Sequence, residues 1–346
     1  MRDRRLRQGS YAWPVQMGMQ GSFVDFWTQS VIGQEGEAHK RLRTLAVPVL
    51  GPDYIASLEP GFTKIAQDLT DRMVKSGTVE FMSDFSAEFS GRVTCLLLNI
   101  DHGDWRSVSG DASTLGLAMG TEAKTHESQI NAACDRLFEL ARDLIRRARD
   151  GADDGGYVQR LVARAAELGN ITDHALENLV VISIFGGVDT TRSQLGHLVH
   201  LFILNPDQWD LLRADPDLAP ACVEEAIRHH PTTTWSTREA IETFEHNGVE
   251  IRQGQTVHVL VHASAMDPAV TDGTNFDITA RRKIHFGFGG GAHNCLGQAI
   301  ARADIAACLR VMAARVAKFE ADGQARWLPD SGNTSPAHLP VRVLPA

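Results

Sequence analysis

Residues 285–302 read H-F-G-F-G-G-G-A-H-N-C-L-G-Q-A-I-A-R, and this stretch determines how the rest of the chain is interpreted. Four glycines precede Cys295, so the backbone can adopt positive φ angles and approach a flat ligand closely. Cys295 also lies just before an expected helix, whose N-terminal amides favour a thiolate over a thiol. A thiolate in such a loop is either a nucleophile or a metal ligand.

Residues 288–297 fit the pattern F-G-x-G-x-H-x-C-x-G, and through it the sequence resembles the haem-thiolate monooxygenases of the cytochrome P450 family. The six specified positions all match: Phe288, Gly289, Gly291, His293, Cys295 and Gly297. The resemblance implies that the Cys295 thiolate is the axial ligand of haem iron, inside a cofactor-binding loop formed by these residues. It further implies that Phe288 packs near the sulfur and that the amides after Cys295 tune its potential.

A long helix is expected from about Thr172 to Asn205. Thr172 or Asp173 can cap its start, and Pro206 disfavours helical geometry at Asn205. At 1.5 Å per residue such a helix is roughly 45 to 50 Å long, so it has to run through the middle of the molecule.

The centre of that helix, residues 185–191, reads F-G-G-V-D-T-T. Two adjacent glycines cost about 1 kcal/mol each relative to alanine, so they need a reason. A close helix–helix contact is one explanation. The resemblance supplies another, in which Gly186 and Gly187 admit O₂ on the distal haem face and Asp189 and Thr190 deliver protons. The same helix face would then border the substrate pocket.

Haem carboxylates require cations, and four residues match the expected positions in order. His39 and Arg43 lie on one helical face and resemble the family's H-x-x-x-R propionate site. Arg238 and His285 match two further propionate contacts. The resemblance therefore assigns these four residues to cofactor binding.

Glu225 and Arg228 resemble the E-x-x-R pair of the family, which is structural and is completed by a third arginine. The usual position of that arginine holds Ala280 here, and Arg281 or Arg282 would have to substitute.

Composition limits the function classes. The 346 residues carry 34 Lys and Arg against 43 Asp and Glu, a net charge of −9, which argues against nucleic-acid binding. We expect neither a membrane span nor a signal peptide, because no sufficiently long apolar run occurs. Five cysteines without a C-x-x-C pair indicate a cytoplasmic protein without disulfides. His197 and His200 could pair on a metal but lack an evident third ligand.

The pattern of the whole chain predicts a single domain over residues 1–346, mostly α with a small β-sheet region (α+β), in the cytochrome P450 fold. Helices are expected at Ile55–Val74, Cys134–Arg149, Tyr157–Leu168, Pro220–His229 and Leu296–Phe319. Residues 248–261 are expected to form a hairpin around a glycine turn, and residues 340–345 a last strand.

His39 comes too early in the sequence for the N-terminal elements of the family to be present upstream of it. We therefore expect the hairpin at Val249–Val261 to lack strand neighbours, with unpaired edge groups that lead either to self-association or to a longer natural chain.

The resulting functional hypothesis is a haem b monooxygenase that inserts one atom of O₂ into an apolar small molecule. Electrons would come from an external ferredoxin and an NAD(P)H-dependent reductase. A basic patch for an acidic ferredoxin is one interpretation of four residues near the loop, and ordinary solvated charge is the other: Arg281, Arg282, Lys283 and Arg302. The region before Phe89 and residues 101–127 are expected to line the substrate pocket.

The sequence offers three alternatives to the monooxygenase hypothesis. A peroxygenase would use H₂O₂ directly and would not need Asp189 and Thr190. A haem-binding sensor would have no turnover. A hydrolase using Cys295 and His293 is disfavoured, because residues two apart at a helix start do not face each other.

Overall fold

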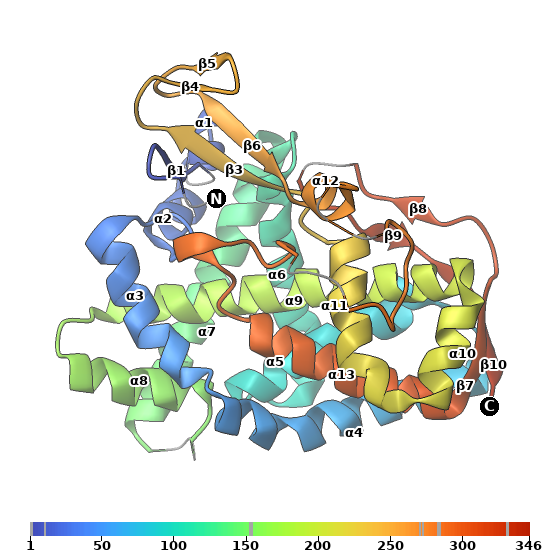
Figure 1. The fold of residues 1–346 in the computed structure, drawn as a ribbon. Coiled ribbons are helices and arrows are strands. Elements are labelled where there is room, and N and C mark those ends of the chain that lie inside the picture. Colours follow the sequence, from blue (N-terminus) through green and yellow to red (C-terminus); the bar gives the residue numbers. More distant parts are fainter. Residues whose placement is uncertain are drawn as a thin grey trace.

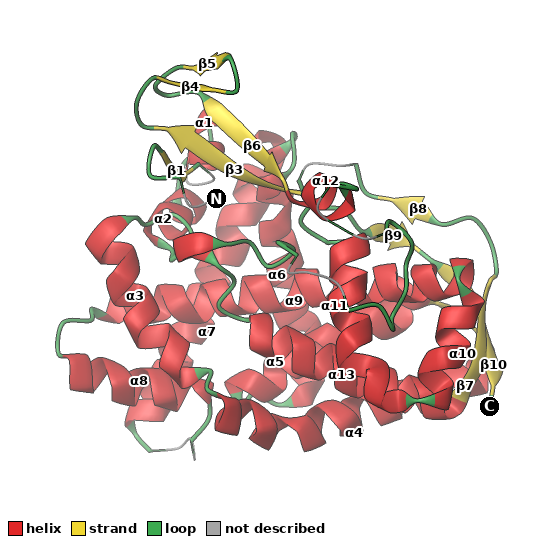
Figure 2. Ribbon diagram, viewed as in Figure 1, coloured by secondary structure: helices red, strands yellow, loops and turns green. Residues whose placement is uncertain are grey.

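A computed structural model describes residues 3–9, 12–151, 155–269, 271, 273–281, 285–329 and 332–346. Helices form the body of the molecule, and the strands gather along the top and the right-hand side in the view of Figure 2. The described helices are α1 (Trp13–Gln16), α2 (Ser22–Gln29), α3 (Gly36–Val49), α4 (Pro52–Ser76), α5 (Ala87–Leu98), α6 (Trp105–Gly116), α7 (Glu127–Arg149), α8 (Tyr157–Leu168), α9 (Asp173–Leu204), α10 (Pro206–Ala214), α11 (Ala219–His229), α12 (Val261–Met266) and α13 (Gln298–Arg315). A π-helical turn, η2 (Met82–Ser86), precedes α5, and short 3₁₀ turns include η4 (Leu117–Met119) and η7 (Gly291–His293).

The strands are short. They are β1 (Leu6–Gln8), β2 (Thr78–Glu80), β3 (Trp235–Ala240), β4 (Phe244–His246), β5 (Val249–Ile251), β6 (Thr256–Leu260), β7 (Val316–Ala321), β8 (Arg326–Trp327), β9 (Pro336–His338) and β10 (Pro340–Pro345). Two three-stranded antiparallel sheets have the orders β1-β3-β6 and β2-β10-β7, and the pairs β4-β5 and β8-β9 form two-stranded ribbons.

Helix α9 crosses the middle of the molecule, as its length predicts (Figure 1). The Thr172 side chain accepts a hydrogen bond from the Ala175 amide and caps the helix, which ends at Leu204 before Pro206 begins α10. It packs against α5, α6, α7, α10 and α11, and most of its side chains are buried. A helix surrounded in this way can be apolar around its whole circumference.

The remaining predicted helices occur as α4, α7, α8 and α11, with their ends within a few residues of the predicted bounds except at the start of α7. The expected helix Leu296–Phe319 is too long by four residues at its C-terminal end. Val316 begins strand β7, which pairs with β10, and this pairing satisfies backbone groups that a longer helix would satisfy locally. The predicted last strand at residues 340–345 is confirmed as β10.

The predicted hairpin at residues 248–261 is wrong in its pairing. β5 pairs backwards with β4, and β6 pairs with β3, so β5 and β6 belong to different sheets. Asn247 and Gly248 both have positive φ, 50° and 80°, which is the geometry of a two-residue turn that closes β4 onto β5. The turn at Gly254 then carries the chain away towards β3.

Within residues 249–261, β5 has one strand neighbour, β4, and β6 has one, β3, so the expected lack of neighbours is wrong but the expected open edge is found among the described strands. β1 pairs antiparallel with β3, with Leu6 opposite Ala240 and Gln8 opposite Arg238, so β3 has a partner on both sides. β6 lies at the edge of this sheet among the described strands.

Within the described residues, the helices contain no segment with the length and hydropathy that crossing a membrane requires.

Candidate functional site

The loop of residues 285–297 carries Cys295 to the start of α13. Gly289 and Gly291 have φ angles of 73° and 77°, which L-residues with side chains rarely adopt. The Cys295 amide donates to the Phe288 carbonyl oxygen over 2.9 Å and closes the loop on itself. Of the five cysteines, Cys295 is exposed and the other four are buried.

The surroundings of the Cys295 sulfur act in opposite directions on its ionisation. Burial raises the pKa of the thiol, whereas the amides of Gly297 and Gln298 and the charges of Arg43 and Arg302 lower it. Cys295 is exposed, yet burial still raises its pKa. Its side chain therefore borders open space within the body of the protein. The amides at the helix start are placed to stabilise a thiolate there.

The centre of α9 borders open space too. Gly186 and Thr190 are exposed one helical turn apart, on a helix that is otherwise mostly buried. A Cβ on Gly186 would meet nothing within 4 Å, whereas one on Gly187 would lie 3.3 Å from Thr94 Oγ1. The Thr190 hydroxyl donates to the Gly186 carbonyl oxygen. The glycine pair therefore serves two purposes, an open face at Gly186 and a close helix contact at Gly187.

Asp189 is held by α6. Ser113 Oγ donates to Asp189 Oδ1 over 3.0 Å, and Arg192 Nη2 lies 3.5 Å from the same oxygen. A Cβ on Gly116 would lie 2.8 Å from Asp189 Oδ2, so α6 approaches this carboxylate closely. Sequence reasoning missed Ser113, because no local pattern connects residues 76 positions apart.

Four basic side chains from separate elements meet beside the loop. His39 and Arg43 come from α3, Arg238 from β3 and His293 from η7. The rings of His39 and His293 lie 4.0 Å apart between centroids, and Arg43 Nη1 donates to the Asn294 carbonyl oxygen over 2.7 Å. Arg238 is buried, and its Nη1 donates to neutral oxygens of three residues: Gln8, Ser236 and Thr237.

This basic cluster, defined as His39, Arg43, Arg238 and His293, faces the carboxylate of Glu35, whose Oε1 lies 3.2 Å from His293 Nε2. Burial lowers the pKa of all four groups, that of His39 to about 4, and the neighbouring positive groups lower both histidine pKa values further. The charge of Glu35 opposes the lowering at His39, Arg238 and His293. A bound anion would offset the cost of burying these positive charges, as Glu35 does in part, so the cluster is suited to carboxylates.

His285 lies apart from the basic cluster. Its Nε2 is 3.2 Å from Glu224 Oε2, and its Nδ1 accepts from the Gly287 amide over 3.1 Å. Arg302 also binds Glu224, so it is an ion-paired residue and not a free surface cation. Arg281 is exposed, and Arg282 and Lys283 lie outside the described residues.

Glu225 and Arg228 form a buried bidentate pair, with Nε–Oε2 and Nη2–Oε1 distances of 2.6 and 2.7 Å. Arg228 also donates to the carbonyl oxygens of Ala265 and Asn275, and the Asp277 amide donates to Glu225 Oε1. The pair thus fastens the segment after α12 to α11. Arg282, one of the two suggested third arginines, lies outside the described residues.

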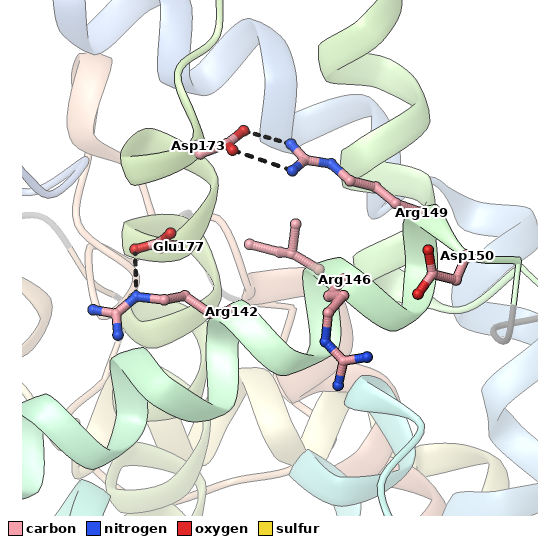
Figure 3. A pocket seen from close by; sticks show the side chains of 7 residues that line it. Arg142, Arg146, Arg149, Asp150, Asp173 and Glu177 are labelled. Atoms are coloured by element: carbon pink, nitrogen blue, oxygen red, sulfur yellow. Dashed lines mark hydrogen bonds and ion pairs between the residues drawn. The ribbon is translucent and has the colours of Figure 1, made fainter.

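A separate cleft lies between the end of α7 and the start of α9 (Figure 3). Four of its six charged side chains form two pairs, Arg149 with Asp173 and Arg142 with Glu177. It shares no residue with the Cys295 loop or the basic cluster. No group of three or more His, Cys, Asp or Glu suited to a metal ion occurs in the described part of the chain, so His197 and His200 gain no third ligand there.

Comparison with known proteins decides the family. The sequence model of Cytochrome P450 matches residues 122–321. The chain belongs to the cytochrome P450 family. It is 31% identical over 347 residues to the luteothin monooxygenase of Streptomyces thioluteus, covering 99% of this chain and 84% of that protein. It is 28% identical over 322 residues to the mycinamicin IV hydroxylase/epoxidase of Micromonospora griseorubida, covering 90% and 79%.

The fold agrees. The crystal structure of CalO2 superposes with a TM-score of 0.91 at 25% identity, covering 99% of this chain and 87% of that one. The predicted α+β class and cytochrome P450 fold are therefore confirmed. The protein is a cytochrome P450 monooxygenase, an oxidoreductase that uses haem b and O₂ to oxidise small molecules.

Proposed function

We propose that this cytochrome P450 would hold haem b through the Cys295 thiolate and would oxidise an apolar small molecule. The observation that carries the proposal is the exposed Cys295 side chain at the start of α13, where the amides of Gly297 and Gln298 oppose the rise in thiol pKa that burial causes. Phe288 and Gly289 shape the loop that presents the sulfur, as the motif predicts.

The residues present fit a haem at this place. His39 Nε2 is buried and has no hydrogen-bond partner within the described residues, and the oxygens of Gln8, Ser236 and Thr237 that accept from buried Arg238 are neutral. Both groups would gain from carboxylates, which haem provides as propionates. The centre of α9 is also uncovered, at Gly186 and Thr190.

We assign the propionates to the basic cluster, His39, Arg43, Arg238 and His293. His285 belongs to the sequence-based assignment but contacts Glu224 instead, so its effect on haem would pass through the loop. Of the three glycines assigned to the cofactor, Gly289 and Gly297 would keep loop backbone accessible to it, whereas Gly187 lies against Thr94 and the open position on α9 is Gly186. When bound, the haem iron supplies O₂ activation and transfer of one oxygen atom at the expense of two electrons.

Proton delivery would rest on the α9 pair. The Asp189 carboxylate would take up a proton from solvent and give it on, and the Thr190 hydroxyl, which now donates to the Gly186 carbonyl, would be the relay at the open face. The Ser113 and Arg192 contacts keep Asp189 at one position. Because consecutive side chains on a helix do not face each other, a proton would pass from Asp189 to Thr190 through water.

The names of the two relatives, luteothin monooxygenase and mycinamicin IV hydroxylase/epoxidase, favour an organic small molecule as substrate. Electrons would come from a separate ferredoxin and an NAD(P)H-dependent reductase.

Carbon monoxide binding tests the ligand assignment. The reduced, haem-loaded protein with CO should show the red-shifted Soret band of thiolate-ligated haem, and Cys295→Ser should abolish it. Cys134→Ala, which changes a buried cysteine on α7, is the control and should keep the band. A wild-type spectrum typical of histidine-ligated haem would remove Cys295 as the ligand.

The source of oxygen separates monooxygenase from peroxygenase chemistry. With ferredoxin and reductase, the wild type should couple NADH consumption to product, and Thr190→Ala should keep consumption while diverting electrons to H₂O₂. Turnover with H₂O₂ alone, at a rate equal to the ferredoxin-supported rate, would favour the peroxygenase alternative.

A further inference from the structure

Glu224, the residue before the buried Glu225–Arg228 pair, joins three elements at the proximal end of the Cys295 loop. Its Oε1 accepts from Arg302 Nε over 2.5 Å, and its Oε2 accepts from Arg302 Nη2 over 3.1 Å. The same Oε2 lies 3.2 Å from His285 Nε2. Since the Gly287 amide donates to His285 Nδ1, the ring proton is on Nε2 and points to Glu224. One carboxylate on α11 thus binds both the entry of the loop and the helix that follows it.

The loop lies tightly on α11 at this point. A Cβ on Gly287 would lie 2.3 Å from Ile227 Cγ2 and 3.1 Å from the Ile227 carbonyl oxygen. A loop this close to a helix can take only one position, and the hydrogen bonds from His285 and Arg302 to Glu224 hold it in that position.

Arg302 joins Glu224 to two residues near Cys295, Phe288 and Gln298. Its guanidinium carbon lies 4.4 Å from the centre of the Phe288 ring, and its Nη1 donates to Gln298 Oε1 over 2.8 Å. The carbonyl of Phe288 accepts from the Cys295 amide. A path of direct contacts therefore runs from Glu224 through Arg302 and Phe288 to the backbone of Cys295.

The charges along this path matter as well. Burial alone would raise the pKa of Glu224, but the hydrogen bonds from His285 and Arg302, and the charge of Arg302, lower it to about 2. Glu224 is therefore ionised at neutral pH and opposes the positive charge of Arg302, one of the two guanidinium groups whose charge favours the thiolate form of Cys295.

We propose that Glu224 is a positioning residue for the Cys295 loop, which it fixes to α11 through His285 and Arg302, and that by offsetting the Arg302 charge it sets the reduction potential of the bound haem. The inference rests on the proposed function, because it takes Cys295 as the haem ligand.

Reduction potentials of the haem-loaded variants test it. Removing a negative charge near the haem stabilises the more negative reduced state, so Glu224→Gln should favour reduction by about threefold or more, roughly 28 mV for one electron. Arg302→Gln should shift the potential in the opposite direction. The double variant Glu224→Gln/Arg302→Gln should return close to the wild type.

Two further variants separate charge from packing. Glu250→Gln removes the same charge from an exposed pair with Arg252 and should leave the potential unchanged. Arg302→Lys keeps the charge but loses the bidentate contact, so its potential should stay near the wild type while its CO complex loses the red-shifted band faster over time.

Each outcome bears on one claim. Equal potentials for Glu224→Gln and Glu250→Gln would overturn the electrostatic role, and equal decay rates of the CO band in wild type and Arg302→Lys would overturn the positioning role. If Glu224→Gln does not fold, Arg302→Gln alone decides, since a purely structural contact predicts no downward shift in potential. A wild-type protein without the red-shifted band would overturn the proposed function itself.

Discussion

Replacing Glu225 with glutamine removes one charge of a buried ion pair while nearly keeping the shape of the side chain. Arg228 and Glu225 are 3% and 4% exposed, and two hydrogen bonds of 2.6 and 2.7 Å join them. The substitution leaves the Arg228 charge buried, with the carbonyl oxygens of Ala265 and Asn275 as its remaining acceptors.

Breaking a buried pair by removing one partner costs roughly 3 to 5 kcal/mol, because the remaining charge is uncompensated. Glutamine keeps one acceptor oxygen, and Arg228 keeps two carbonyl acceptors, so we expect the lower end, about 3 kcal/mol. At about 2 °C per kcal/mol, the midpoint of thermal unfolding should fall by roughly 6 °C.

Thermal unfolding of the haem-loaded protein, followed by far-ultraviolet circular dichroism, measures this loss. Glu250→Gln is the matched control, since its partner Arg252 is exposed and such pairs contribute about 0 to 1 kcal/mol. If Glu225→Gln and Glu250→Gln unfold at the same temperature, the buried pair does not hold the segment after α12 to α11, and the reasoning fails.

Two further predictions follow from other contacts. Ser113→Ala removes the α6 hydrogen bond to Asp189 and should lower the ratio of product formed to NADH consumed. Thr114→Ala is the control and should leave this ratio unchanged, because the Thr114 hydroxyl donates to a carbonyl oxygen within α6. Equal ratios in the two variants would show that Ser113 has no part in proton delivery. Burial lowers the pKa of His197 from 6.5 to about 4, so the unfolded state binds more protons and stability should fall between pH 6.5 and 4. At pH 5 this group alone contributes about 2 kcal/mol of loss, and His197→Gln should flatten the thermal unfolding midpoint against pH; an unchanged slope would contradict this.

Local patterns in the sequence were enough for the parts of the molecule whose chemistry is local. The run before Cys295 predicts a glycine loop and a helix start because positive φ angles and N-terminal amides depend on neighbouring residues alone. The capping residue Thr172 and the terminating Pro206 likewise define α9 without reference to the rest of the chain. The periodicity of α8 predicts its bounds for the same reason.

Tertiary structure decided which distant groups meet. The Asn247–Gly248 turn pairs β5 with β4, and β3 takes β6 as its partner. β5 and β6 therefore do not pair with each other. His285 turns to Glu224 and Ser113 reaches Asp189, although nothing along the chain links these residues. A hydrogen bond between separate elements depends on how helices pack, and packing is a property of the whole core, which no short stretch of sequence contains.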